Sequence, residues 1–187
     1  EKEEAIKTLK KALIVQPNNI ALLSNISSTL AELDKFAEAL TFIVRAIAVE
    51  PADAELLARY AVILSRSGDT NKATAQFKQA LDLNAHDRYT LGSFGTHLLS
   101  LDEPEKSLEY IEKALSMDPN SGPDLYNRAC ALVRLGRLDE AMKSLSSAVL
   151  SGFSNDLLLA SDSDLEPLRS DLIFGPQLDQ LLIELRE

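Results

Sequence analysis

Residues 54–85 read AELLARYAVILSRSGDTNKATAQFKQALDLNA and contain two apolar stripes at helical spacing. The first stripe has the i, i+3, i+4, i+7 spacing of one helix face and consists of Leu57, Tyr60, Ala61 and Leu64. The second stripe consists of Ala73, Phe77, Ala80 and Leu81. Gly68 stands between them, and glycine suits the left-handed conformation that ends many helices. The stretch therefore predicts an antiparallel pair of helices.

The same pattern recurs along the chain with a period of 34 residues. One row of alanines consists of Ala12, Ala46, Ala80, Ala114 and Ala148. A row of leucines precedes it and consists of Leu23, Leu57, Leu91 and Leu125. A third row holds only small residues: Ser27, Ala61, Gly95 and Ala129. Small side chains let two helix backbones approach closely, so the period predicts stacked helix hairpins.

The composition limits the possible function. The chain has 187 residues, with 19 Lys and Arg against 29 Asp and Glu, and a formal charge of −10. Such a charge argues against binding to the phosphates of a nucleic acid. Apolar residues make up 45%, too many for a disordered acidic tail. No apolar run approaches the length of a membrane span, so we expect no membrane insertion and a cytoplasmic location.

The period and its residues resemble the tetratricopeptide repeat. The resemblance implies an all-α fold, a right-handed α-solenoid of antiparallel helix hairpins with a C-terminal helical cap. The expected divisions are a partial repeat at 1–19, repeats at 20–53, 54–87, 88–121 and 122–155, and a cap at 156–187. Five residues depart from the repeat pattern. Asp34 and Asp102 replace the turn glycine, Ser107 replaces an alanine, and Ala85 and Phe153 replace the terminal proline.

The C-terminal segment also resembles the closing segment of bacterial tetratricopeptide arrays, through Gly152-Phe153 and the run from Ser161 to Asp171. A solenoid needs such an end because its last hairpin would otherwise expose an apolar face. We expect short helices around Leu159 and Leu168, and a last helix that starts at Pro176.

No motif indicates catalysis, a metal or a cofactor. Asp162 and Asp164 mimic the start of a calcium loop, but proline stands at 167, where that loop requires glycine. We expect Asp162 to cap a helix instead. His97 is expected to pack between helices, and Cys130 to point into the concave face as a small packing residue. The chain is therefore expected not to be an enzyme.

In tetratricopeptide proteins the first helices form a concave wall that commonly holds a peptide. Mapping the family's exposed positions onto this chain selects eleven candidate groove residues. The polar candidates are Asn25, Arg59, Arg66, Asn127 and Arg134. The candidates for close or apolar contact are Ala58, Val62, Tyr89, Gly92, Leu99 and Tyr126. The lysines and asparagines with which chaperone-binding members clamp a C-terminal carboxylate are absent from the corresponding positions.

The resemblance thus implies a protein-interaction scaffold that binds a peptide segment of a partner. Two alternatives stay open. Residues 1–16 form a second helix without its first, so a second copy of the chain could cover Ala5, Leu9 and Ala12. The chain does not begin with Met, so the array could also be a regulatory part of a larger multidomain protein.

Overall fold

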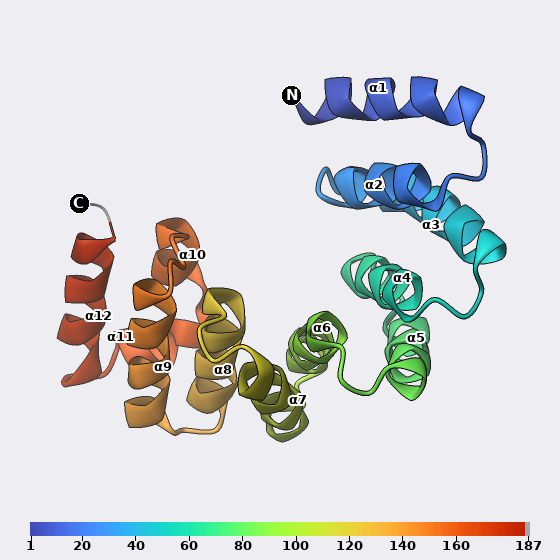
Figure 1. Cartoon of the computed structure of the whole chain (residues 1–187). Helices are drawn as coiled ribbons and strands as arrows, with labels where there is room; N and C mark the ends of the chain where they lie inside the picture. The colour runs from blue at the N-terminus through green and yellow to red at the C-terminus, as the bar shows by residue number, and fades with distance from the viewer. Residues whose placement is uncertain (186–187) are drawn as a thin grey trace. The chain divides into compact units, whose positions relative to one another are not determined.

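The computed structural model describes residues 1–185, and every regular element in that range is helical (Figure 1). The longer helices are α1 (Lys2–Val15), α2 (Ile20–Ala31), α3 (Phe36–Val49), α4 (Ala54–Arg66), α5 (Thr70–Leu83), α6 (Arg88–Ser100), α7 (Pro104–Met117), α8 (Gly122–Arg134) and α9 (Leu138–Leu150). The C-terminal segment contains α10 (Asp156–Ser161), the 3-10 turn η1 (Ser163–Leu165), α11 (Glu166–Arg169) and α12 (Phe174–Glu184). The predicted all-α fold is confirmed.

The chain forms two compact units, Glu1–Ser93 and Phe94–Glu187. The first unit holds α1 to α5 and the start of α6, around a core that includes Leu23 and Ile43. The second unit holds the rest of α6 and the helices that follow, around a core that includes Leu132 and Leu145. The division falls within α6, so the assignment of residues to individual repeats and to a cap stays a prediction.

Helices within a pair approach closely at the row of small residues. The hydroxyl of Ser27 on α2 donates to the carbonyl of Ala39 on α3 at 2.8 Å, and both residues are buried. In the second unit the hydroxyl of Ser107 on α7 donates to the carbonyl of Gly95 on α6, also at 2.8 Å. Serine can thus replace the usual alanine at 107 without leaving a buried polar group unpaired, because its hydroxyl donates to the facing backbone.

Five helix ends within residues 1–185 turn through a residue with positive φ. Three of these residues are glycines: Gly68, Gly136 and Gly152. The other two are Asp34 at φ 56° and Asp102 at φ 58°. Two backbone hydrogen bonds close the turn at Asp34, from Asp34 N to Ala31 O and from Lys35 N to Leu30 O, and equivalent bonds close the glycine turns. These bonds satisfy the last carbonyls of the helix.

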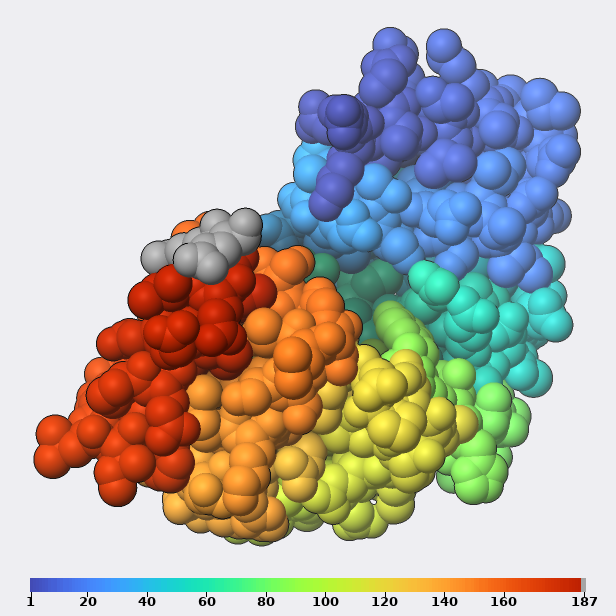
Figure 2. Space-filling view, turned by 60° about the vertical axis from the view of Figure 1, so that its left-hand side comes forward, coloured from blue at the N-terminus to red at the C-terminus, as the bar shows by residue number. Residues whose placement is uncertain are grey.

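The last helix begins earlier than we expected. It starts at Phe174 and not at Pro176, because the carboxylate of Asp171 accepts from the backbone N–H groups of Ile173 and Phe174. Pro176 then lies in the first helical turn, where its missing N–H is not needed. Gly175 is also required, since a Cβ there would lie 2.5 Å from the carbonyl oxygen of Arg169. The space-filling view shows α12, in red, against the orange surface of the second unit (Figure 2).

Gly95→Ala should destabilise the protein. An added Cβ would lie 2.5 Å from Cγ1 of Ile111, a fully buried side chain, and 3.2 Å from the carbonyl oxygen of Ser107. We expect a net loss of about 1–2 kcal/mol in urea unfolding, since overpacking outweighs the gain in helix propensity. The double variant Gly95→Ala/Ile111→Ala should lose less than the sum of the two single variants. Strict additivity would show that these residues do not collide.

Candidate functional site

The first unit contains a hollow of about 230 Å³ between α2, α4 and the start of α6. We call it the first-unit hollow, and its lining consists of Ser28, Ala31, Glu32, Arg59, Val62, Ile63, Arg66 and Tyr89. Four of the predicted groove residues are among them: Arg59, Val62, Arg66 and Tyr89. Two cations, one carboxylate and one aromatic ring therefore face a common space with a partly apolar floor.

Arg59 is held in place from three sides. Its Nε and Nη2 donate to one carboxylate oxygen of Glu55 at 2.9 and 2.6 Å, one helical turn earlier. Its Nη1 donates to the hydroxyl of Ser28 on the preceding first helix at 3.1 Å. The guanidinium also lies 5.8 Å from the centre of the Tyr89 ring. Such a restrained cation loses little conformational entropy when a ligand binds.

Arg66 pairs with the aspartate that replaces glycine in the turn after α2. Its Nη2 lies 2.9 Å from the carboxylate of Asp34, and its guanidinium lies 5.2 Å from the centre of the Phe36 ring. In the second unit, Arg134 makes the matching ion pair with Asp102 at 3.3 Å. Each aspartate adopts positive φ, which is unfavourable for residues with a side chain, and gains a cation from the next first helix.

The second unit repeats these contacts between α6 and α8. Nδ2 of Asn127 donates to the hydroxyl of Thr96 at 2.9 Å, as Arg59 does to Ser28 in the first unit. In the second unit, however, the C-terminal segment lies against the surface of α8 that carries Tyr126 and Arg134. Arg134 binds both carboxylate oxygens of Asp164 at 2.7 and 2.8 Å. The acidic turn at residues 162–164 thus covers the part of this face around Arg134 and Tyr126.

Tyr126 and Cys130 are buried beneath that turn. The hydroxyl of Tyr126 donates to the carboxylate of Asp162, and its ring stacks on Phe153 with centroids 4.7 Å apart. Burial, followed by the charges of Asp162 and Asp164, raises the pKa of the Cys130 thiol to about 12. Burial also raises the pKa of Tyr126. Both groups are therefore protonated at neutral pH.

Cys130, Asp162 and Asp164 place three ligand-type atoms within 4.8 Å of one another. Both carboxylates are already engaged, since Asp164 pairs with Arg134 and Asp162 accepts from Tyr126. We therefore assign the cluster to the attachment of the C-terminal segment.

The structure corrects the expected exposure of several candidate residues. Ala58, Leu99 and Tyr126 are buried, and so is Gly92. Ala58 packs in the first unit against Leu57 and Ala80, so its small side chain serves helix packing. Leu99 and Tyr126 belong to the core of the second unit. Asn25 is exposed on α2, but it is not part of the lining of the first-unit hollow.

Sequence reasoning missed the contacts that close the second face. Asp162 caps η1 through the N–H of Asp164, as expected, but the same side chain also binds Tyr126. Phe153 stands where proline is usual, and its ring covers Tyr126. Two features of the sequence could have indicated these contacts. One is an aromatic residue, Phe153, at a position where the repeat has proline, and the other is the pair Asp162 and Asp164, which the repeat pattern does not contain.

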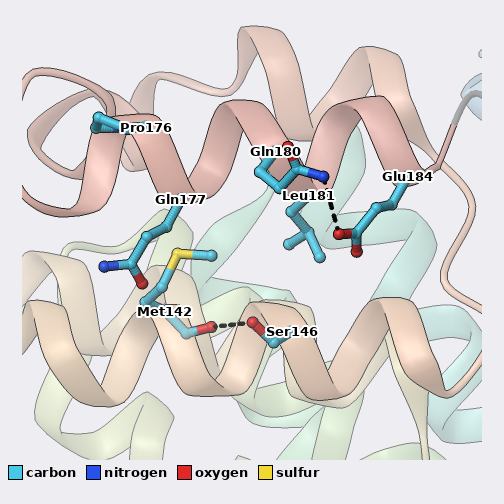
Figure 3. Close-up of a pocket in the computed structure, with 7 residues that line it drawn as sticks. All are labelled: Met142, Ser146, Pro176, Gln177, Gln180, Leu181 and Glu184. Atoms are coloured by element: carbon cyan, nitrogen blue, oxygen red, sulfur yellow. Dashed lines mark hydrogen bonds between the residues drawn. The ribbon is translucent and has the colours of Figure 1, made fainter.

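A second hollow, of about 350 Å³, lies between α9 and α12 in the second unit (Figure 3). Met142 and Leu181 line it, and Gln177, Gln180 and Glu184 stand at its sides. Gln180 donates to Glu184 at 3.1 Å within the same helix. We interpret this hollow as a packing gap between α9 and the last helix of the C-terminal segment.

Sequence comparison identifies the repeats directly. Two tetratricopeptide repeat models match the chain, one at residues 54–87 and 93–121 and the other at residues 110–143. The chain therefore contains tetratricopeptide repeats. It is 27% identical over 146 residues to a TPR repeat-containing protein of Dictyostelium discoideum, covering 74% of this chain and 55% of that relative. A STIP1 homologue of the same organism is 31% identical over 83 residues, which are 44% of this chain and 15% of the homologue.

Solved tetratricopeptide structures have the same solenoid fold. A thermophilic TPR protein of Thermus thermophilus superposes with a TM-score of 0.73 at 20% identity, covering 97% of this chain and 91% of that one. YrrB, described as a TPR protein with an unusual peptide-binding site, superposes with a TM-score of 0.63 at 16% identity, covering 95% and 92%. The predicted α-solenoid class is confirmed.

The tetratricopeptide fold assigns the chain to a class of protein-interaction scaffolds. The chain spans about half or less of the length of the curated relatives it matches. No helix among the described residues is long and apolar enough to cross a bilayer. The expectation that the chain is not an enzyme stays a prediction.

Cys130 should resist alkylation in the folded protein. With its pKa raised to about 12 by burial, the thiol should react with iodoacetamide at pH 8 at least about a hundredfold more slowly than an unfolded control, because only the thiolate reacts. Asp164→Asn should speed the reaction, since it weakens the bond to Arg134 and removes a negative charge near the thiol. Equal rates in the folded, variant and unfolded proteins would show that the acidic turn does not cover Cys130.

Proposed function

We propose that this tetratricopeptide repeat protein binds a peptide segment of a protein partner in the first-unit hollow. The observation that carries the proposal is the restrained guanidinium of Arg59 beside Tyr89 and Val62 in one open space. Arginine and aromatic side chains dominate the binding energy of most protein interfaces. The Tyr89 side chain is partly accessible, with 41% of the residue exposed.

The proposal assigns the polar contacts of the first unit to Arg59 and Arg66. Arg59 would donate to backbone carbonyls or side-chain oxygens of the peptide, while Val62 and Tyr89 cover its apolar groups. Of the candidates in the second unit, Arg134 binds Asp164 of the C-terminal segment, whereas Asn127 donates to Thr96 on α6. A peptide would reach Arg134 only after that segment moves.

Peptides selected from a random displayed library against the full chain should depend on Arg59. Arg59→Ala should weaken their binding at least about tenfold, the effect expected of a central interface arginine. The matched control is Lys78→Ala, which removes an exposed cation from α5, outside the hollow. Calorimetry measures the affinities, and circular dichroism checks folding. Equal affinity of the parent protein and Arg59→Ala would contradict the proposal.

Self-association through α1 is a second candidate function. Ile6 and Leu13 of α1 are buried in the first unit, whereas Ala5 and Ala12 are exposed. Two large apolar residues at the end of the helix are exposed too, Ile14 at 79% and Val15 at 80%. An apolar surface of this kind favours association with another helix.

Sedimentation velocity over a hundredfold range of protein concentration tests this second candidate. If α1 self-associates, the weight-average sedimentation coefficient should rise with concentration, because dimerisation follows mass action. Val15→Asp should abolish the rise, while Lys78→Ala should preserve it. A monomer at every concentration would exclude self-association through α1.

A further inference from the structure

The two units contain equivalent contacts on their first-helix faces. Arg59 and Ser28 are 31 positions apart, as are Asn127 and Thr96, and both pairs are hydrogen bonded. The two arginine–aspartate ion pairs also share a single spacing of 32 positions. Two periods, or 68 residues, therefore relate the two faces. The residues 68 positions after the lining of the first-unit hollow are Thr96, Leu99, Ser100, Asn127, Cys130, Ala131, Arg134 and Leu157.

In the second unit this face holds an acidic turn of the chain itself. Asp164 binds Arg134 through both carboxylate oxygens, while Nη1 of the same guanidinium lies 3.3 Å from Asp102. Asp162 meanwhile accepts from Tyr126. A single arginine in this register therefore holds the aspartate of the preceding turn and a second carboxylate together, because a guanidinium offers five donors.

We propose that the first-unit hollow binds an acidic turn of a partner protein, of the form Asp-x-Asp, with Arg66 holding one carboxylate as Arg134 holds Asp164. This inference rests on the proposed function and specifies the chemistry of its ligand. Arg66 is in the same register as Arg134, pairs with Asp34 at 2.9 Å, and has 43% of its side chain exposed. The exposed part of its guanidinium therefore faces the hollow and can donate to a carboxylate there.

The differences between the two faces further define the ligand. Arg59 replaces Asn127, which adds a positive charge, and Val62 replaces Cys130, which keeps the floor apolar. Glu32 opposes an acidic ligand, because its carboxylate lines the hollow, although Lys2 pairs with it at 2.9 Å. Glu32→Gln should therefore tighten binding of an acidic turn, which a neutral ligand would not show.

The test is an NMR titration of the isotope-labelled full chain with a synthetic peptide of residues 161–169, SDSDLEPLR, blocked at both ends. The amide signals of Ser28, Val62 and Arg66 should shift. Arg66→Ala should weaken binding about tenfold, the loss expected for one charge-assisted bidentate pair. Lys78→Ala is the matched control and should bind as the parent does. A peptide with asparagine at 162 and 164 should also bind about tenfold more weakly, without any change to the protein.

Three results would overturn the inference: no shifts up to about 5 mM peptide, shifts confined to α8 and the C-terminal segment, or equal binding by the parent and Arg66→Ala. The proposed function is judged separately. If library peptides without acidic residues still require Arg59, peptide binding in the hollow stands and only the acidic ligand is refuted. If neither kind of peptide depends on the hollow, both proposals fail.

Discussion

The close approach of two helices inside each pair is the contact on which the rest of the structure depends. At the row of small residues, the backbones come near enough for Ser27 to bond the carbonyl of Ala39 and for Ser107 to bond that of Gly95. A Cβ at Gly95 would already collide with Ile111. Because each such contact joins residues only 12 positions apart, every pair forms from local sequence, and stability accumulates from neighbouring pairs and their interfaces.

This local rule leaves one face of the first helices free to vary. The interior of each pair needs alanine, glycine or serine at fixed positions, whereas Arg59 and Asn127 occupy equivalent positions with different chemistry. Both side chains nevertheless donate to a hydroxyl on the preceding first helix. The hydrogen bond thus orients the side chain. The remaining donors of that side chain then determine which ligands the surface of the first helices can bind.

The helix pairs of the periodic part were predictable from sequence, whereas in the aperiodic part the short helices were predictable and their contacts were not. The helix pairs follow from stripes such as Leu57, Ala61 and Leu64, and the turn at Gly68 from the conformational freedom of glycine. The burial of Tyr126 could not be read in the same way, because it results from Phe153 and Asp162, at separations that the 34-residue period does not contain. The pairing of Asp34 with Arg66 and of Asp102 with Arg134 was likewise not predicted from the sequence.

The two faces differ most in what competes for them. The acidic turn on Arg134 is tethered to the same chain, so it occupies its arginine without the entropic cost of bringing two molecules together, and its effective concentration is on the order of millimolar or more. To displace Asp164, a partner would have to compete with this effective concentration, either by binding Arg134 more tightly or by being present at a higher concentration. Arg66 is 43% exposed in its side chain and shares its register with Arg134, so an external carboxylate meets less competition there. Two arginines with the same repeat position therefore differ in use: Arg134 fixes the C-terminal segment, and Arg66 is the one that we propose to recognise a partner.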